Sequence, residues 1–261
     1  MKIAIGHLYP DIMSAYGDRG NIDTIRRRCA WRDIGTDVAE VRLGDPLPAD
    51  LDLIMIGGGG ESQQQVIARD LYAVKGSAIR AAVAGGAAAL AIGAGFELLG
   101  RFCQPERGAE LPGAGLFDCW TIRSGRIRPG RDEPSGEARA ERHIGNLVVR
   151  WGNDILVGAE CHSGDTYLGA SAEPLGEVLT GHGNCGSGVE GVVVGGAIGT
   201  NLRGPCLPLN PALADFLIVA ALGRRHQTAE LAPLPDDVEE AARTAAVTSL
   251  RRARQRSGAA R

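Results

Sequence analysis

The chain has 261 residues, which is enough for one large domain or two small ones. Apolar residues make up 44% of it and charged residues 23%, as is typical of a globular protein. The net charge of −3 gives no basic footprint for nucleic acid, and glycines interrupt the most apolar stretch, residues 81–99, so we expect no membrane span.

The first half of the chain alternates short apolar runs with helical patterns. The expected strands are Lys2–Gly6, Val38–Leu43, Leu51–Ile56 and Ala87–Ile92, and the expected helices are Asn21–Asp33, Gln63–Ala84 and Phe96–Phe102. This order predicts a mostly parallel sheet with helices on both faces. Glycine clusters at 57–60 and 93–95 each follow a strand, and ligands in such sheets lie at the carboxyl ends of strands.

The second half is less regular. We interpret Arg123–Arg142, which is polar and contains Pro129 and Pro134, as a surface loop or hairpin insert. The expected strands are Asn146–Arg150, Ile155–Glu160 and Gly191–Thr200, and the expected helices are Pro211–Leu222 and Asp237–Arg254. We therefore predict one main domain over residues 1–222, followed at 223–261 by a helix and a solvated basic tail.

The six cysteines include no Cys-x-x-Cys pair, so they indicate neither a structural zinc site nor a redox motif. No charged leader precedes the first strand, so we expect no signal peptide, a cytoplasmic location and free thiols. The glycines at 57–60 are not followed by Lys-Ser or Lys-Thr, and the phosphate-loop interpretation fails. We expect no metal and no cofactor.

The segment Ile92–Gly100 combines a strand, a glycine-flanked turn and a helix, as in a nucleophile elbow. Such a turn presents one side chain at a helix N-terminus, where the dipole lowers the pKa of a thiol and free amides can hold an oxyanion. Its sequence, Ile-Gly-Ala-Gly-Phe-Glu-Leu-Leu-Gly, resembles the elbow I-C-x-G-[YF]-Q-x-L-G of the class I glutamine amidotransferases. The nucleophilic cysteine of that pattern falls on Gly93.

Five further segments, in order along the chain, resemble motifs of the GatD group within that family. They are Tyr16–Ile22 with Arg26–Arg32, Gly57–Gln64 (GGGQDxEQ in the group), Val157–Thr166 (GFENHxGRT), Gly183–Gly191 (GxGN…EG) and Ile198–Asn210 (GTYLHGPxLPxN). Each match is weak alone, but together they cover residues 1–222 and identify the chain as a member of the group.

The resemblance implies a three-layer, flavodoxin-like α/β fold and a glutaminase subunit of lipid II isoglutaminyl synthase. Such a subunit releases ammonia from glutamine for a Mur-ligase-like partner, MurT, which amidates D-glutamate of the peptidoglycan stem. The chemistry needs a thiolate nucleophile, a histidine base and an oxyanion hole. On this chain the nucleophile position is Gly93 and the histidine position is Arg203.

The remaining site residues also come from the resemblance. Backbone amides of the Gly58–Gly59 region and of Ala94 would form the oxyanion hole. Arg142, in Arg-His-Ile-Gly-Asn, matches the arginine that binds glutamine, and Glu97 replaces a glutamine near the pocket.

Several departures from the family pattern fall at this one site. Glycine at 93 cannot act as a nucleophile, and the arginine at 203 cannot act as a base near neutral pH. Asp165 stands where the family has arginine, and we expect it to pair with Arg203. We favour a natural pseudo-glutaminase. An altered working sequence and a site with new chemistry stay open.

Other candidate nucleophiles or ligands are weaker. Cys161 and His162 are neighbours on a strand and point to opposite faces, so we expect a packed thiol and a structural histidine. Cys206 lies three residues beyond the histidine position. Cys185 and His182 share a glycine-rich loop that we interpret as an ordinary turn.

Two classes of function follow. The chain is either a subunit of an enzyme complex, supplying or channelling ammonia to a Mur-ligase-like partner, or a non-catalytic module that binds glutamine or a similar small molecule.

Overall fold

The central sheet is built from the apolar runs of the first half together with a hairpin near residue 195. A computed structural model of the chain describes residues 1–123, 142–226 and 230–258. The strands are β1 (Lys2–Leu8), β2 (Gly35–Val41), β3 (Leu53–Ile56), β4 (Ala88–Ile92), β13 (Val192–Val194) and β14 (Ala197–Thr200). They lie in the order β13-β14-β4-β3-β1-β2, and every neighbouring pair is parallel except β13 with β14.

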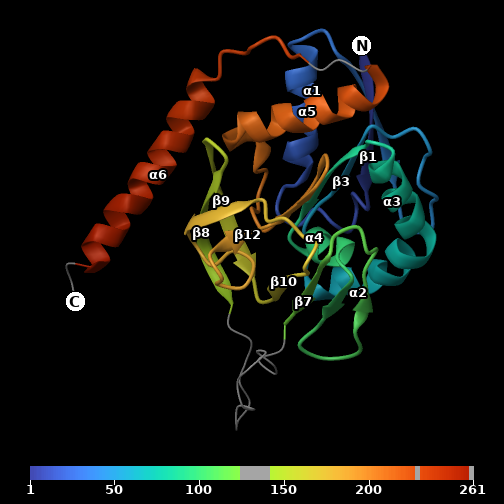
Figure 1. The fold of residues 1–261 in the computed structure, drawn as a ribbon, viewed down its shortest axis with the longest axis horizontal. Helices are drawn as coiled ribbons and strands as arrows, with labels where there is room; N and C mark the ends of the chain where they lie inside the picture. The colour runs from blue at the N-terminus through green and yellow to red at the C-terminus, as the bar shows by residue number, and fades with distance from the viewer. Residues whose placement is uncertain (124–141, 227–229, 259–261) are drawn as a thin grey trace.

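Helices cover both faces of this sheet. On one face lie α1 (Arg19–Ala30) and α5 (Pro211–His226), and on the other lie α2 (Glu61–Asp70), a π-helical turn (Leu71–Lys75), α3 (Gly76–Ala84) and α4 (Ala94–Leu99). In Figure 1, β1 and β3 lie between α1 and α5 on one side and α2 and α3 on the other. Alternate residues of β3 divide between the two cores: Leu53 and Met55 pack with α1 and α5, whereas Ile54 and Ile56 pack with α2 and α4. The expected three-layer α/β fold is confirmed.

Two smaller sheets flank the central one. The first contains β5 (Phe102–Gln104), β6 (Leu111–Pro112), β7 (Cys119–Ile122) and β10 (Asp165–Leu168), in the order β10-β7-β5-β6. The second contains β8 (His143–Trp151), β9 (Asp154–His162), β11 (Gly176–Thr180) and β12 (Val189–Glu190), in the order β12-β11-β8-β9. The sequence predicted only parts of β8 and β9.

Two sequence expectations need correction. The single strand expected over Gly191–Thr200 is wrong, because Gly195 adopts φ 56° and the chain turns back as the β13–β14 hairpin. Arg123, expected in a surface insert, has only 7% of its surface exposed. The rest of that insert, 124–141, lies outside the described residues.

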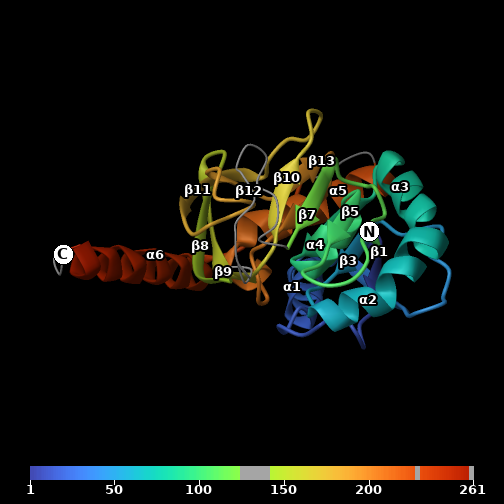
Figure 2. The ribbon, with the colours of Figure 1, turned by 90° about the horizontal axis from the view of Figure 1, so that it is seen from below.

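The C-terminal helix, α6 (Asp237–Gly258), extends away from the body of the molecule (Figure 2). It follows α5, which continues past the predicted domain boundary at residue 222. A short 3-10 turn, Leu207–Leu209, and β9 contact this helix. None of the helices in the described ranges has both the length and the hydropathy needed to cross a bilayer.

Candidate functional site

The elbow forms where the central strands end. Gly93 follows β4 and precedes α4, and its amide donates to the carbonyl of Thr200 at the end of the neighbouring β14 (2.8 Å). Its φ of 51° and ψ of −113° lie in a region that side chains other than glycine rarely adopt. The glycines at 57–60 follow β3 on the other side of β4, so the predicted site segments converge at one edge of the sheet.

The guanidinium of Arg203 occupies the space that a side chain at residue 93 would need. A Cβ atom built on Gly93 would lie 2.7 Å from Cζ, Nε and Nη2 of Arg203. Arg203 is only 6% exposed, and its Cζ lies 4.7 Å from the ring centroid of Tyr16, in a cation–π contact. The amide of Arg203 donates to the carbonyl of Ala159 (2.7 Å), which holds the arginine segment against β9.

One of the two predicted oxyanion donors is already engaged. The amide of Gly58 donates to Oδ2 of Asp18 at 2.9 Å, and a Cβ atom on Gly58 would lie 3.5 Å from Nη1 of Arg203. Burial raises the pKa of Asp18, although the Gly58 amide and Arg203 act in the opposite direction. Ala94 is the first residue of α4, so its amide cannot bond within the helix. The Gly58 amide is therefore occupied, whereas the Ala94 amide lies at the N-terminus of α4.

Glu97 is held in a buried polar cluster instead of facing a substrate. Its Oε2 accepts a hydrogen bond from Nε2 of Gln64 (2.6 Å) and forms an ion pair with Arg123. Burial alone would raise the pKa of Glu97, but the charge of Arg123 and the Gln64 hydrogen bond outweigh it and lower the pKa below 4.5. The carboxylate is therefore ionised and neutralises a buried arginine.

Arg142 remains exposed at the start of β8. Its Nη2 lies 3.5 Å from Sγ of Cys161, and this contact raises the pKa of Arg142. Of the predicted substrate-binding side chains, this guanidinium is therefore the one that solvent reaches.

The expected Arg203–Asp165 ion pair is wrong. Asp165 instead accepts a hydrogen bond at Oδ1 from Nε2 of His182 (3.0 Å), and no ion pair joins Asp165 to Arg203 among the described residues. Asp165 and Arg203 both depart from the family pattern, but Asp165 contacts His182 whereas Arg203 contacts Tyr16.

His162 is buried and has a structural contact, Nδ1 to the carbonyl of Gly164 at 2.9 Å. Burial lowers the pKa of His162, but the nearby Glu160 carboxylate outweighs it and the pKa is raised overall. Burial raises the pKa of the Cys206 thiol to about 12, which leaves it protonated and unreactive at neutral pH.

Three residues at the site were not singled out as functional from the sequence: Tyr16, Asp18 and Arg123. Tyr16 and Asp18 belong to a segment that served only to indicate the family, and Arg123 was placed in a loop. The ion pair of Arg123 with Glu97 could not be anticipated, because the burial of Glu97, which calls for a cationic partner, was not predicted.

Comparison with known proteins gives a consistent result. Residues 4–211 match the CobB/CobQ-like glutamine amidotransferase domain. The GatD subunit of lipid II isoglutaminyl synthase (glutamine-hydrolyzing) from Staphylococcus aureus is 30% identical over 86% of this chain and 86% of that protein. The Streptococcus pneumoniae subunit is also 30% identical, over 91% and 87%. The glutaminase domain of Trypanosoma brucei CTPS shares the fold, with a TM-score of 0.51 and 12% identity over 84% of this chain and 93% of that one.

Proposed function

This chain belongs to the CobB/CobQ-like glutamine amidotransferase family, and we propose that it is a GatD-type subunit of a lipid II-amidating complex whose glutaminase site is closed. The similarity to the two named GatD subunits over most of both chains supports the assembly and the pathway. The partner would be a Mur-ligase-like protein of the MurT type, and the complex would work in the cytoplasm.

The position of Arg203 carries the proposal of a closed site. A glutaminase needs a thiolate, a base and free oxyanion donors. Here residue 93 has no side chain, the guanidinium lies 2.7 Å from where its Cβ would be, and Asp18 accepts from the Gly58 amide. Glycine at 93 removes the thiolate, arginine at 203 replaces the base, and the Asp18 contact occupies one of the oxyanion donors.

A closed subunit would still stabilise its ligase partner. Since the nucleophile that the ligase needs is ammonia, the complex would take it from solution. The family scaffold is retained around the elbow, including the strand order and the glycine turns, which supports a role that depends on the surface of the subunit and not on its thiol.

A glutaminase assay on the complex with its Mur-ligase-like partner tests this function. We expect no ammonia release from the unaltered chain, from Gly93→Cys or from Arg203→His, and measurable release only from the double variant Gly93→Cys/Arg203→His. Ammonia release by the unaltered chain would contradict a closed site. If that release were lost in Cys161→Ala, the Cys161 thiol would be the nucleophile.

A second candidate is a module that binds a small molecule such as glutamine without turnover. The exposed guanidinium of Arg142 supports it, because a free cation at the site could hold an α-carboxylate. Isothermal titration of the isolated chain with glutamine distinguishes the two. Binding that is lost in Arg142→Ala would favour the module, and absence of binding would favour the partner-dependent subunit.

A further inference from the structure

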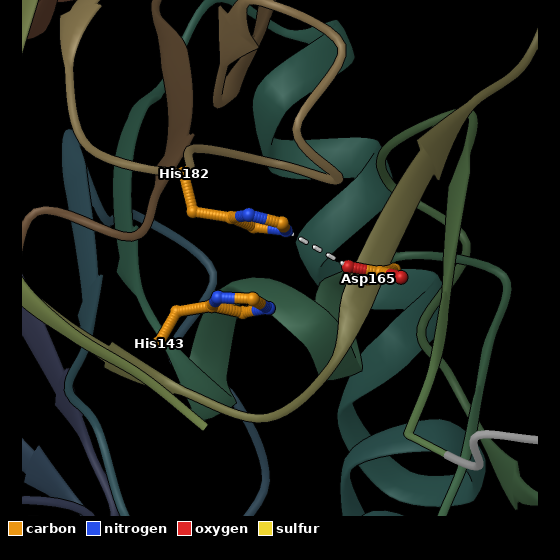
Figure 3. A group of neighbouring side chains, drawn as sticks. All are labelled: His143, Asp165 and His182. Atoms are coloured by element: carbon orange, nitrogen blue, oxygen red, sulfur yellow. Dashed lines mark hydrogen bonds and ion pairs between the residues drawn. The ribbon is translucent and has the colours of Figure 1, made fainter. Parts of the chain in front are cut away.

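Three side chains of metal-binding type meet between the two small sheets (Figure 3). His143 is the first residue of β8, Asp165 the first of β10, and His182 lies in the turn after β11. One ligand atom from each lies within 4.8 Å of the others, and all three residues are partly exposed. We propose that they bind one divalent transition-metal ion, and Zn²⁺ is the ion used to test the site.

The backbone around the cluster holds these elements together. The Glu160 carboxylate accepts from the amides of His182 (2.7 Å) and Gly183 (3.0 Å), which fixes the turn that carries His182. The amide of Thr166 donates to the carbonyl of Asn184 (2.7 Å), which ties the start of β10 to the same turn. These backbone contacts hold the segments of His182 and Asp165 together, and the pairing of β8 with β9, His143 opposite His162, brings His143 beside them.

The side-chain geometry requires only a local adjustment to admit an ion. Nε2 of His182 lies 3.0 Å from Oδ1 of Asp165, and the rings of His143 and His182 stack with centroids 3.4 Å apart and planes 7° apart. Bonds of about 2.0–2.2 Å to an ion place neighbouring ligand atoms somewhat over 3 Å apart. The stacked rings must tilt apart so that both lone pairs point at the ion, and their partial exposure leaves room for this rotation.

The donor set selects the class of ion. Two imidazoles and one carboxylate suit zinc and its first-row neighbours, whereas calcium and magnesium prefer oxygen ligands. Three protein ligands leave a position for water. The family motif has arginine at residue 165, so the carboxylate and the ligand set arise from a departure of this chain. A metal site here differs from the sequence expectation that the turn of His182 and Cys185 is ordinary.

Metal binding by tag-free, chelator-stripped full-length chain tests the site. We expect one Zn²⁺ or Co²⁺ per chain in a competition with a chromophoric chelator, and a thermal midpoint raised by several degrees. Asp165→Asn and His182→Gln should each weaken binding by roughly tenfold or more. His226→Gln, on α5, and Cys185→Ser are matched controls and should leave the affinity unchanged.

X-ray absorption spectroscopy on the unaltered zinc-loaded chain provides a second test. It does not depend on whether the variants fold. The expected first shell contains nitrogen and oxygen, with imidazole scattering and no sulfur. Absence of stoichiometric binding, sulfur in the shell, or unchanged affinity in a folded Asp165→Asn/His182→Gln double variant would each overturn the metal site.

Discussion

At residue 93 two independent features favour glycine, and they can be separated by experiment. The backbone has φ 51°, and the guanidinium of Arg203 fills the volume beside it. Gly152 provides a matched control, because it has φ 57° but nothing within 4 Å of an added Cβ. The two positions therefore share a positive φ and differ in the space around the added Cβ atom.

We expect Gly93→Ala to destabilise the protein more than Gly152→Ala. Both changes place a side chain at a positive φ, at a cost of about 1–3 kcal/mol. The methyl at 93 must also displace Arg203 from the Tyr16 ring, a loss of about 0.5–2 kcal/mol. Urea unfolding measures the difference, which should disappear in an Arg203→Ala background. Equal effects of the two glycine changes in the unaltered background would contradict the steric role of Arg203.

The Glu97–Arg123 pair makes a second prediction at this scale. Glu97→Gln leaves the buried Arg123 with the partly exposed Glu61 carboxylate, 4.0 Å from its Nη1, as its remaining ion-pair partner among the described residues. The free energy of unfolding should therefore fall by about 3 kcal/mol. Glu177→Gln is the control, because its ion pair with Arg150 is exposed and should contribute about 0–1 kcal/mol. Urea unfolding at pH 7 compares them, and an equal loss in both variants would contradict the buried pair.

The same pair predicts a pH dependence. The pKa of Glu97 is lowered from 4.5 in the folded state, so its stabilising contribution is complete above about pH 4.5 and is lost as the pH falls through the lower folded value. The difference in unfolding free energy between the unaltered chain and Glu97→Gln should therefore be constant at neutral pH and shrink in acid. If the difference in unfolding free energy grew in acid, the pKa of Glu97 would be raised and not lowered in the folded state.

The sequence located the elbow residues but not their contacts. Gly93 and Arg203 were assigned by motif, since each motif position has a fixed offset from a strand end. The contact between residue 93 and the Arg203 guanidinium could not be predicted. It depends on the pairing of β4 with β14 and on the side-chain direction of Arg203. Asp165 was assigned to Arg203 by charge alone, and β10 instead carries it to His182.

At the scale of elements, a buried arginine joins the start of α6 to the body. Arg28 on α1 forms ion pairs with Asp215 on α5 (2.7 Å) and with Asp236, just before α6 (2.5 Å). The side chain of Arg28 is only 3% exposed, so both carboxylates neutralise a charge that is largely removed from water. Arg32 adds a second bond to Asp215 (2.7 Å).

We expect Asp236→Asn to loosen α6 while leaving the central sheet intact. The change removes one of two charged partners, a loss of about 1.5–3 kcal/mol. Hydrogen exchange should rise over 237–249 and stay unchanged in β1, β3 and β4. Asp237→Asn, at the exposed neighbouring residue, is the control. Equal exchange in the two variants would show that the anchor lies elsewhere.

The sequence predicted the elements of the central sheet well because their burial produces unbroken apolar runs, as in Leu53–Ile56 and Ala88–Ile92. Apart from parts of β8 and β9, it missed the strands of the flanking sheets, because these strands are short or lack a clear period. Strands such as Leu111–Pro112 and Val189–Glu190 have two residues each and form no period. The His143–Asp165–His182 cluster joins the start of β8, the start of β10 and the turn after β11, and their proximity depends on how the two flanking sheets meet, so it could not be predicted either.

At the scale of the whole molecule, a closed glutaminase predicts which nitrogen source its complex uses. In the complex with a Mur-ligase-like partner, amidation should increase with added ammonium and with pH, because ammonia and not ammonium is the nucleophile. Glutamine at any concentration should leave the rate at its background, since Arg203 blocks residue 93. The complex carrying Gly93→Cys/Arg203→His is the control and should gain a glutamine-dependent rate. Product formation followed by mass spectrometry measures all of these. Equal rates with glutamine and with ammonium in the unaltered complex would mean that the subunit still hydrolyses glutamine, by chemistry that residue 93 does not supply.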